Sequence, residues 1–428
     1  MKNTIKDLKT FLILWSTQSL SQLGSAMTGF ALTLWLYEKT GSALQTALLA
    51  VCSYAPYVVM SIFAGALSDR WDKKKVMLVC DTMAACCSVA VLVLLKADLL
   101  LPVHMYILNA LTGLMNTVQQ PASDVAMTMI TPKEYYQKTS GLRSLSASLV
   151  TILNPILATA LYALAGMDIV IYVDLTTFAI AFLSLLSGVK LSVPEKKEEA
   201  EKESFLETAR AGLVCLRKNE LVLVLILFLA GVNFVASAFD AVLPALILPR
   251  KNGGEAVLGM VTSCAGIAMF AGSLIVTVLP APKNRIRVIY LTMLFSLGTE
   301  NFILAFTDWP VLWCVGQIIG WLLVPVMSAN LDVILRTTIP LDMQGRVYSC
   351  RNTLQFFTIP IGLLFGGFMV DDICEPVIAA APAQGMLVRL FGAGKGSGAA
   401  MMMFILGVLG VVICLGFGRV LRRYRYTE

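Results

Sequence analysis

The chain has 428 residues, of which 57% are hydrophobic and only 14% are charged. A soluble domain carries roughly 25% charged residues, so this chain has too few charges to cover a surface in water. Lipid, by contrast, requires an apolar exterior. The composition therefore excludes an ordinary soluble enzyme. We attribute the net charge of +6 to loops beside a membrane and not to nucleic-acid binding.

Apolar runs of about 20 residues recur along the chain, and each is long enough to cross a bilayer core of roughly 30 Å. They predict an all-α membrane protein with 12 transmembrane helices. The spans 76–96 and 397–419 are nearly featureless, with few polar residues. The predicted spans are 10–37, 43–67, 76–96, 102–125, 139–165, 168–190, 220–249, 256–281, 286–306, 309–335, 345–370 and 397–419.

The longest polar stretch, 191–219, contains PEKKEEAEKES and predicts a charged cytosolic linker between an N-terminal half, 1–190, and a C-terminal half, 220–428. The Gly-, Ala- and Pro-rich stretch 371–396 is placed outside. With this arrangement 27 of the 33 Lys and Arg residues fall on the inside. Because positive charge favours the cytosolic side, both termini are expected to be cytoplasmic.

The two halves repeat one another in sequence. FAGAL at 63–67 returns as FAGSL at 270–274, an offset of 207. Asp124 and Asp332 each stand eight residues before a proline, an offset of 208. Matches at nearly one offset predict two pseudo-symmetric six-helix halves of parallel topology.

The loop after the second span reads GALSDRWDKKK, residues 65–75. It resembles the signature G-x-x-x-D-R-x-G-R-K/R of the major facilitator superfamily, although Asp72 stands at the second glycine and Lys73 at an arginine. The strings WLYEKTGSA, PASDVAMTMITPKE, QGRVYS and FGAGKGSG are similar to macrolide-efflux-like drug:proton antiporters, of which siderophore exporters are a related branch. The resemblance implies the major facilitator fold over nearly the whole chain.

In that family the signature loop latches the two halves together on the inside. The resemblance implies that Asp69 faces the start of the eleventh span, and that the nearby cations pair with Asp124. The alternative is a positive-inside loop with incidental charges. The gate residues are Gly65, Asp69, Arg70, Lys73, Lys74, Asp124, Asp332 and Arg336.

The family lines its central cavity with the first, fourth, seventh and tenth spans. In this chain those spans carry polar residues at helical spacing, and such residues in lipid must face protein or water. The alternative is that some of them only hydrogen-bond between helices. The expected cavity residues are Gln18, Gln22, Ser25, Asn109, Asn116, Gln119, Asn233, Ser237 and Gln317.

The expected function is secondary active export of a lipophilic small molecule by alternating access, coupled to protons or sodium. No ATP-binding loop, catalytic constellation, metal cluster or cofactor site is present in the sequence. Asp240 is the first candidate for proton coupling. Its competitors, Glu300 and Asp174, are expected nearer the outer interface, where a charge costs less.

The expected setting is the bacterial inner (plasma) membrane, where the protein would act as a monomer embedded in lipid and bind no nucleic acid. Two rival functions remain open. One is an importer or lipid flippase of the same fold. The other is a non-transporting sensor or assembly protein, although no soluble signalling domain is visible in the sequence.

Overall fold

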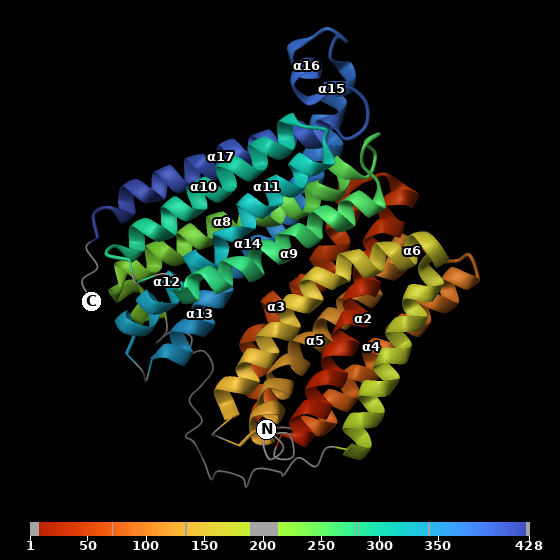
Figure 1. Cartoon of the computed structure of the whole chain (residues 1–428), viewed down its shortest axis with the longest axis vertical. Coiled ribbons are helices and arrows are strands. Elements are labelled where there is room, and N and C mark those ends of the chain that lie inside the picture. Colours follow the sequence, from red (N-terminus) through yellow and green to blue (C-terminus); the bar gives the residue numbers. More distant parts are fainter. Residues whose placement is uncertain are drawn as a thin grey trace. The chain divides into compact units, whose positions relative to one another are not determined.

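A computed structural model describes residues 8–70, 72–132, 135–188, 213–278, 280, 282–340 and 343–424. Within these residues the regular structure is helical (Figure 1). The first half contains α2 (Lys9–Thr40), α3 (Ala43–Arg70), α4 (Lys73–Lys96), α5 (Pro102–Met129) and α6 (Tyr136–Gly188). The second half contains α8 (Glu220–Ile247), α9 (Glu255–Val278), α10 (Arg285–Phe306), α11 (Pro310–Leu322), α12 (Val324–Thr338), α13 (Gln344–Phe356), α14 (Thr358–Phe368), η2 (Met369–Cys374), α15 (Glu375–Ala380), α16 (Met386–Phe391) and α17 (Ser397–Leu421).

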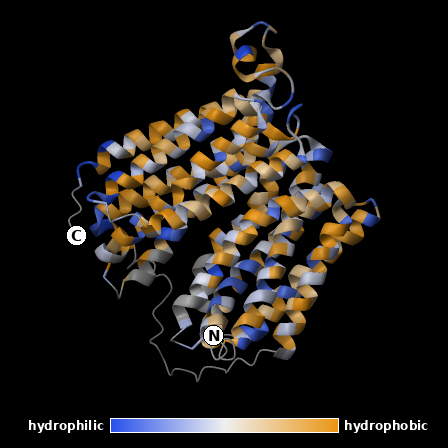
Figure 2. Cartoon of the chain, viewed as in Figure 1, coloured by the Kyte–Doolittle hydropathy of each residue, from blue (hydrophilic) through white to orange (hydrophobic). Residues whose placement is uncertain are grey.

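Nine segments of the described chain are long and apolar enough to cross a membrane, and apolar residues cover most of their length (Figure 2). They confirm an all-α, multi-span protein. Some predicted spans merge in the structure: α6 holds both 139–165 and 168–190, with a kink at Gly166, where φ is 77°. The count of 12 spans stays a prediction, because α2 and α5 carry enough polar residues to fall outside the nine segments.

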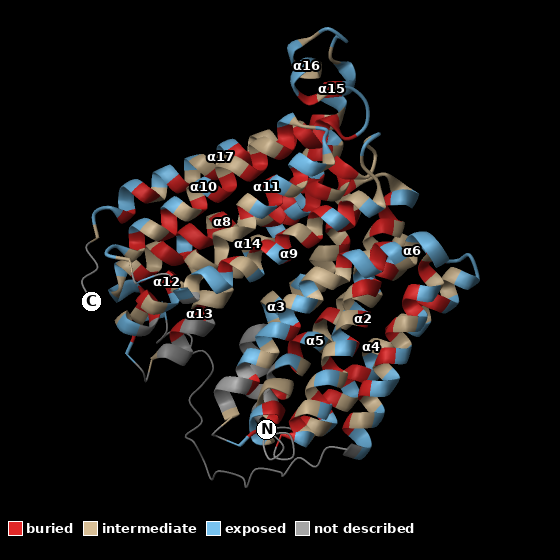
Figure 3. Cartoon of the chain, in the orientation of Figure 1, coloured by how far each residue is buried: buried red, intermediate tan, exposed pale blue. Residues whose placement is uncertain are grey.

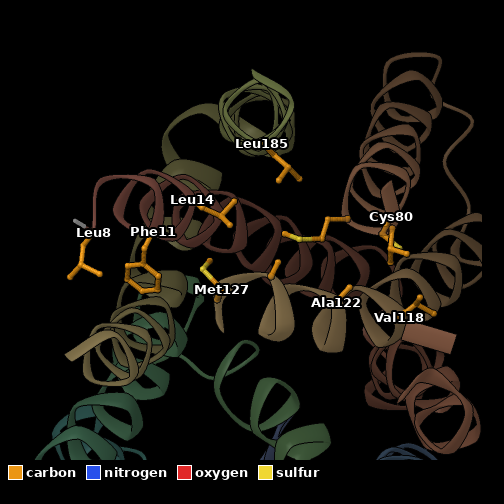
Figure 4. Packing of buried hydrophobic residues seen from close by; sticks show 11 residues of the cluster. Leu8, Phe11, Leu14, Cys80, Val118, Ala122, Met127 and Leu185 are labelled. Carbon is orange, nitrogen blue, oxygen red and sulfur yellow. The ribbon is translucent and has the colours of Figure 1, made fainter. Parts of the chain in front are cut away.

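The chain divides into two compact units, which we describe separately. Unit 1 comprises residues 1–39 and 52–200, and unit 2 comprises residues 40–51 and 201–428. The core of unit 1 is a cluster of apolar side chains in which α2 meets α4, α5 and the end of α6 (Figure 4). Phe11 and Met77 are almost fully buried in it. Its labelled members are Leu8, Phe11, Leu14, Cys80, Val118, Ala122, Met127 and Leu185.

Unit 2 is built around α8, whose buried residues continue over most of its length (Figure 3). It packs against α14 and α17, and α10 packs against α17 and α11. Aromatic pairs join these helices: the ring centroids of Phe234 and Phe365 lie 5.2 Å apart, and those of Phe228 and Phe417 lie 5.8 Å apart. An apolar helix with buried residues on all sides is typical of the centre of a membrane bundle.

The tenth and eleventh predicted spans are not continuous α-helices. The backbone between α11 and α12 departs from α-helix at Leu323, and Pro325 begins the next turn. The eleventh span continues as helix past its predicted end at residue 370, through the π-helix η2 and α15 to Ala380. A π-helical turn inside a longer helix often re-aims side chains at a functional position.

One side chain that η2 directs is Asp371, which caps the start of α3. Its carboxylate accepts hydrogen bonds from the backbone N–H of Leu44 at 2.8 Å, the N–H of Ala43 at 3.0 Å and the hydroxyl of Ser42 at 2.6 Å. An acid at a helix N-terminus satisfies N–H groups that have no partner within the helix. The backbones meet closely here, because a Cβ added at Gly367 would lie 2.6 Å from Leu44 Cα.

This cap explains a difference from the predicted halves, 1–190 and 220–428. Residues 40–51 group with unit 2, whereas α3 from Cys52 onward belongs to unit 1. Pro56 lies just beyond that division. Proline removes one helical hydrogen bond to the preceding turn, so α3 has a weakened point close to where it passes from one unit to the other.

A second anchor in unit 2 holds the segment that follows α15. Arg250, just after α8, forms an ion pair with Asp308 and donates hydrogen bonds to the carbonyls of Phe391 at 2.8 Å and Gly396 at 3.1 Å. Burial lowers the pKa of the Arg250 guanidinium, and the charge of Glu375 acts in the opposite direction. The FGAGKGSG string is therefore fixed to the end of α8.

Candidate functional site

Unit 1 contains a cavity of about 510 Å³ between α2, α5 and α6. Ligand sites commonly have volumes of roughly 300–1,000 Å³. The lining combines amide and hydroxyl groups with a few apolar side chains. It consists of Trp15, Gln18, Ser19, Gln22, Gln120, Ser123, Met127, Arg143, Ser144, Ser146 and Ala147.

The lining contains one formal charge, that of Arg143, and no acid. The indole Nε1 of Trp15 is buried and has no hydrogen-bond partner among the described residues. An unmatched buried donor costs about 1–3 kcal/mol, which a ligand carrying an acceptor would recover. The cavity is therefore suited to a molecule of mixed polarity that presents hydrogen-bond acceptors, with Trp15 and Met127 supplying apolar contact.

The structure brings only part of the predicted cavity set to this pocket. Gln18 and Gln22 line it. Ser25 and Gln119 are engaged with buried acids, Asn109 is half-buried on α5, and Asn116 is exposed on the same helix. Sequence reasoning missed several other lining residues, among them Trp15, Gln120 and Arg143.

The remaining predicted cavity residues, Asn233, Ser237 and Gln317, lie in unit 2. Asn233 Nδ2 donates to the carbonyl of Gln355 at 3.2 Å, and the Ser237 hydroxyl donates to the carbonyl of Asn233 at 2.7 Å. Gln317 is 1% exposed, and its Oε1 has no partner among the described residues. The Asn233 bond joins α8 to α13, as the alternative of interhelical hydrogen bonding expects, whereas the Ser237 bond stays within α8.

Beside the pocket, Arg143 forms an ion pair with Asp124. In the second half, Arg351 Nη1 lies 3.9 Å from Asp332 Oδ1. The two acids are 208 residues apart in the sequence, and so are the two arginines. This is the offset already found for the acids and the prolines that follow them. Each half therefore carries its own Asp–Arg pair at equivalent positions, and the arginines are a part of the repeat that sequence reasoning missed.

The described part of the gate differs from the expected pairing, because Asp124 pairs with an arginine of its own half, on α6. Lys73 is buried, and Lys74 Nζ donates to the carbonyl of Leu186 at 2.9 Å. Four predicted gate positions lie outside the described side chains: Gly65, Asp69, Arg70 and Arg336.

Asp81 on α4 is an acid in the predicted span 76–96, which we expected to be nearly featureless. That expectation was wrong at this position. Its side chain is buried in unit 1, with the residue 8% exposed. Two amides donate to it: Gln119 Nε2 at 2.5 Å to Oδ1, and Gln18 Nε2 at 3.4 Å to Oδ2. Because Gln18 also lines the pocket, Asp81 is one side chain removed from the cavity.

Asp174 on α6 is a second buried acid in unit 1, with the residue 4% exposed. Three hydroxyls from two neighbouring helices donate to its carboxylate: Ser25 at 2.9 Å, Thr28 at 3.2 Å and Ser88 at 2.9 Å. Polar partners from α2 and α4 therefore replace water around this carboxylate, and its place nearer the outer interface stays a prediction.

The two predicted coupling acids of unit 2 differ in burial. Glu300 on α10 is buried, with the residue 5% exposed, whereas Asp240 on α8 is exposed. The Trp321 side chain hydrogen-bonds Glu300, whose Oε1 has no partner among the described residues. The carboxylate packs against Gly320, where an added Cβ would overlap Glu300 Oε2.

Comparisons with known proteins agree with this architecture. Residues 14–363 match the family described as Major Facilitator Superfamily. The chain is 25% identical over 367 residues to macrolide efflux protein A of Streptococcus pyogenes, covering 85% of this chain and 90% of that protein. It is 23% identical to the multidrug efflux pump Tap of Mycolicibacterium fortuitum, over 81% of this chain and 86% of the pump. The crystal structure of nucleoside transporter NupG superposes with a TM-score of 0.68 at 14% identity, covering 97% of this chain and all of that one (100%).

Proposed function

We propose that this protein exports lipophilic small molecules in exchange for protons. The chain belongs to the major facilitator superfamily, and it is a multi-pass membrane transporter and not an enzyme. The observation that carries this proposal is the cavity in unit 1, whose lining mixes amide, hydroxyl and apolar groups. The named activities of the macrolide and multidrug efflux relatives support export.

The lining also refines the expected substrate. A cavity lined by amides, hydroxyls and one arginine favours an acceptor-rich molecule of mixed polarity, because its donors need acceptors. Macrolide-like compounds combine a large apolar ring with many oxygen acceptors, and we propose this class as the substrate.

Protons are proposed to drive export through carboxylates that lie within the membrane spans. Such acids are costly in lipid and tend to mark proton pathways. Asp240, Glu300 and Asp174 are the acids proposed from the sequence. Glu300 is the strongest of the three on geometry, because it is buried and its Oε1 has no partner among the residues that the structure describes. Replacing proton by sodium gradients in the same assay distinguishes the two ions.

Alternating access is proposed to depend on the inner ends of the spans. The signature loop residues Gly65, Asp69 and Arg70 would contact the other half in one state, while the Asp124–Arg143 and Asp332–Arg351 pairs keep each half's own helices together. We further propose that both termini and the linker are cytoplasmic in the bacterial plasma membrane, and that the monomer is the working unit.

Transport by everted membrane vesicles tests the proposal. Vesicles from cells that express the protein should accumulate a radiolabelled macrolide when respiration acidifies their lumen, and an uncoupler should abolish this accumulation. Vesicles from cells with the empty vector are the control. Uptake by right-side-out vesicles instead would favour the rival importer, a possibility to which the nucleoside transporter with the same fold gives some weight. Movement of labelled lipid alone would favour a flippase, and no transport of any kind would favour a sensor.

A further inference from the structure

Among the buried acids in the described part of the chain, Asp81 alone touches a side chain that lines the pocket. We propose that Asp81 and Gln18 form a switch that makes proton binding and substrate binding compete in unit 1. The inference rests on the proposed exchange of substrate for protons, and it assigns the exchange to a residue outside the acids already considered.

The two amide contacts fix how Gln18 is oriented. An ionised carboxylate can only accept hydrogen bonds, so the Gln18 amide must turn its Nε2 toward Asp81. Its other end, Oε1, is then the part of the amide left for the pocket. Gln119 holds the opposite carboxylate oxygen at 2.5 Å, so Asp81 cannot follow Gln18 freely.

Protonation reverses this requirement. When Asp81 takes up one proton on Oδ2, the oxygen that faces Gln18, that oxygen becomes an O–H donor, while Oδ1 keeps accepting from the Gln119 amide. Gln18 must then present Oε1 to Asp81 and Nε2 to the pocket. The pocket therefore offers an acceptor when Asp81 is ionised and a donor when it is protonated. No bond is made or broken except that between the proton and the carboxylate.

The sign of the coupling follows from this geometry. A substrate hydroxyl or amine that donates to Gln18 Oε1 stabilises the ionised arrangement, so substrate and proton oppose one another. Mutual opposition is what an exchanger needs, because proton entry releases the substrate. Trp15 and Arg143 keep their donor character in both states, so they can hold the substrate's acceptors without sensing the proton.

Few other charges lie near Asp81. The helices α2 and α5 contribute the amides of Gln18 and Gln119. The helix α6 contributes Asp174, which is bonded to Ser88, two helical turns after Asp81 on α4. The Cys80 thiol is the adjacent titratable group on α4 itself. Arg143 is engaged with Asp124 beside the pocket. None of the described basic side chains forms an ion pair with Asp81, so the amides dominate its surroundings.

Infrared difference spectroscopy tests the switch without any substrate. Purified protein in liposomes, with isotope-labelled glutamine side chains, is compared between acid and alkaline pH. The wild type should gain the carbonyl band of a protonated carboxylic acid together with a change in a glutamine amide band. Asp81→Asn should lose both features. Gln18→Leu should keep the carboxylic acid band and lose the amide change.

Asp372→Asn is the control, because it removes an exposed acid of η2 that is not part of the pocket lining. It should keep both spectral features. A paired change that survives in Asp81→Asn would overturn the proposal. So would an amide change that survives in Gln18→Leu. Thermal unfolding of each variant establishes that the protein is folded.

Binding of erythromycin, as a macrolide probe, gives the second measurement. Wild-type affinity should fall by up to about tenfold per unit decrease in pH, the limit for one competing proton. Affinity in Asp81→Asn should not depend on pH, and in Asp372→Asn it should depend on pH as in the wild type. If erythromycin binds neither protein, the proposed substrate class fails while the infrared result still decides the role of Asp81. Equal pH dependence in wild type and Asp81→Asn would contradict the switch.

Discussion

Unit 1 and unit 2 repeat one another in sequence but treat their buried acids differently. In unit 1, Asp81 and Asp174 are each held by side-chain donors from neighbouring helices. In unit 2, Glu300 packs against a glycine, is hydrogen-bonded by the Trp321 side chain and keeps one oxygen without a partner among the described residues, and Asp240 is exposed. The repeat therefore preserves the frame of the two halves, while the polar chemistry in the middle of the spans has diverged.

The conserved offset of the Asp–Arg pairs sharpens this contrast. Asp124–Arg143 and Asp332–Arg351 occupy equivalent places in the two halves. Neither Asp81 nor Asp174 has an acid 208 residues later in the chain, since Ile289 and Pro382 stand there. We infer that the ion pairs serve the motion common to both halves, whereas the buried acids serve tasks particular to each.

The largest effect is expected from Gly320→Ala in unit 2. The added Cβ would occupy the place of Glu300 Oε2 and push the carboxylate away from α11, at a cost of about 1–3 kcal/mol for an overpacked site. Thermal unfolding in detergent measures the loss. Gly29→Ala on α2 is the control, because nothing lies within 4 Å of its added Cβ. Equal unfolding temperatures for the two variants would show that the close packing of Glu300 against Gly320 does not contribute to stability.

Asp124→Asn is expected to reduce transport about fivefold at equal expression, because an exposed ion pair contributes up to about 1 kcal/mol. Asp332→Asn should have a smaller effect, since its pair is longer at 3.9 Å. Vesicle uptake of the macrolide probe measures both. Exchanging the charges in Asp124→Arg with Arg143→Asp should restore part of the activity. Wild-type rates in both single variants would show that the symmetric pairs are incidental.

Asp371→Ala tests an acid of unit 2 that is as fully bonded as those of unit 1. Losing the cap of α3 should lower the stability by about 1 kcal/mol, the usual contribution of an N-terminal cap. The neighbouring Asp372→Ala, at an exposed position of the same π-helix, provides the control. The unfolding midpoint should fall in the first variant alone, and an equal fall in both would mean that the cap does not stabilise α3.

The smallest effect is expected from Thr28→Val, which removes one of three hydroxyls from Asp174 and keeps the side-chain shape. Because the hydrogen bonds from Ser25 and Ser88 remain, the loss of stability should lie at the lower end of the range of about 0.5–1.5 kcal/mol for one hydrogen bond. Chemical unfolding resolves such a change. A loss as large as that in Asp174→Asn would show that the three donors act as one unit.

The sequence predicted the helical membrane architecture and the family, because apolar runs and the loop motif are local signals. It also placed Gln18 and Gln22 where a pocket lies, since helical spacing brings them to one face. The partners of Asp81 could not be predicted, because Gln18 and Gln119 lie 63 and 38 residues away in the chain. Packing between helices, and not any local pattern, brings them together.

Two other features had different reasons for escaping prediction. Arg143 and Arg351 could have been found by extending the 208-residue comparison of the acids to nearby arginines. The grouping of residues 40–51 with unit 2 depends on Asp371, which lies in a π-helical turn and caps α3. No local sequence pattern predicts such a turn. The burial of the Glu300 and Asp174 side chains likewise depends on which helices pack over them.

The exchange of substrate for protons is tested most directly in proteoliposomes loaded with erythromycin and a pH-sensitive dye. When wild-type protein lets the macrolide leave down its gradient, the lumen should acidify, and the number of protons gained should follow the macrolide lost. Asp81→Asn should release macrolide without acidifying the lumen, while Asp372→Asn, which changes an exposed acid, should acidify it as the wild type does. Macrolide efflux without proton entry in the wild type, or undiminished proton entry in Asp81→Asn, would contradict the account.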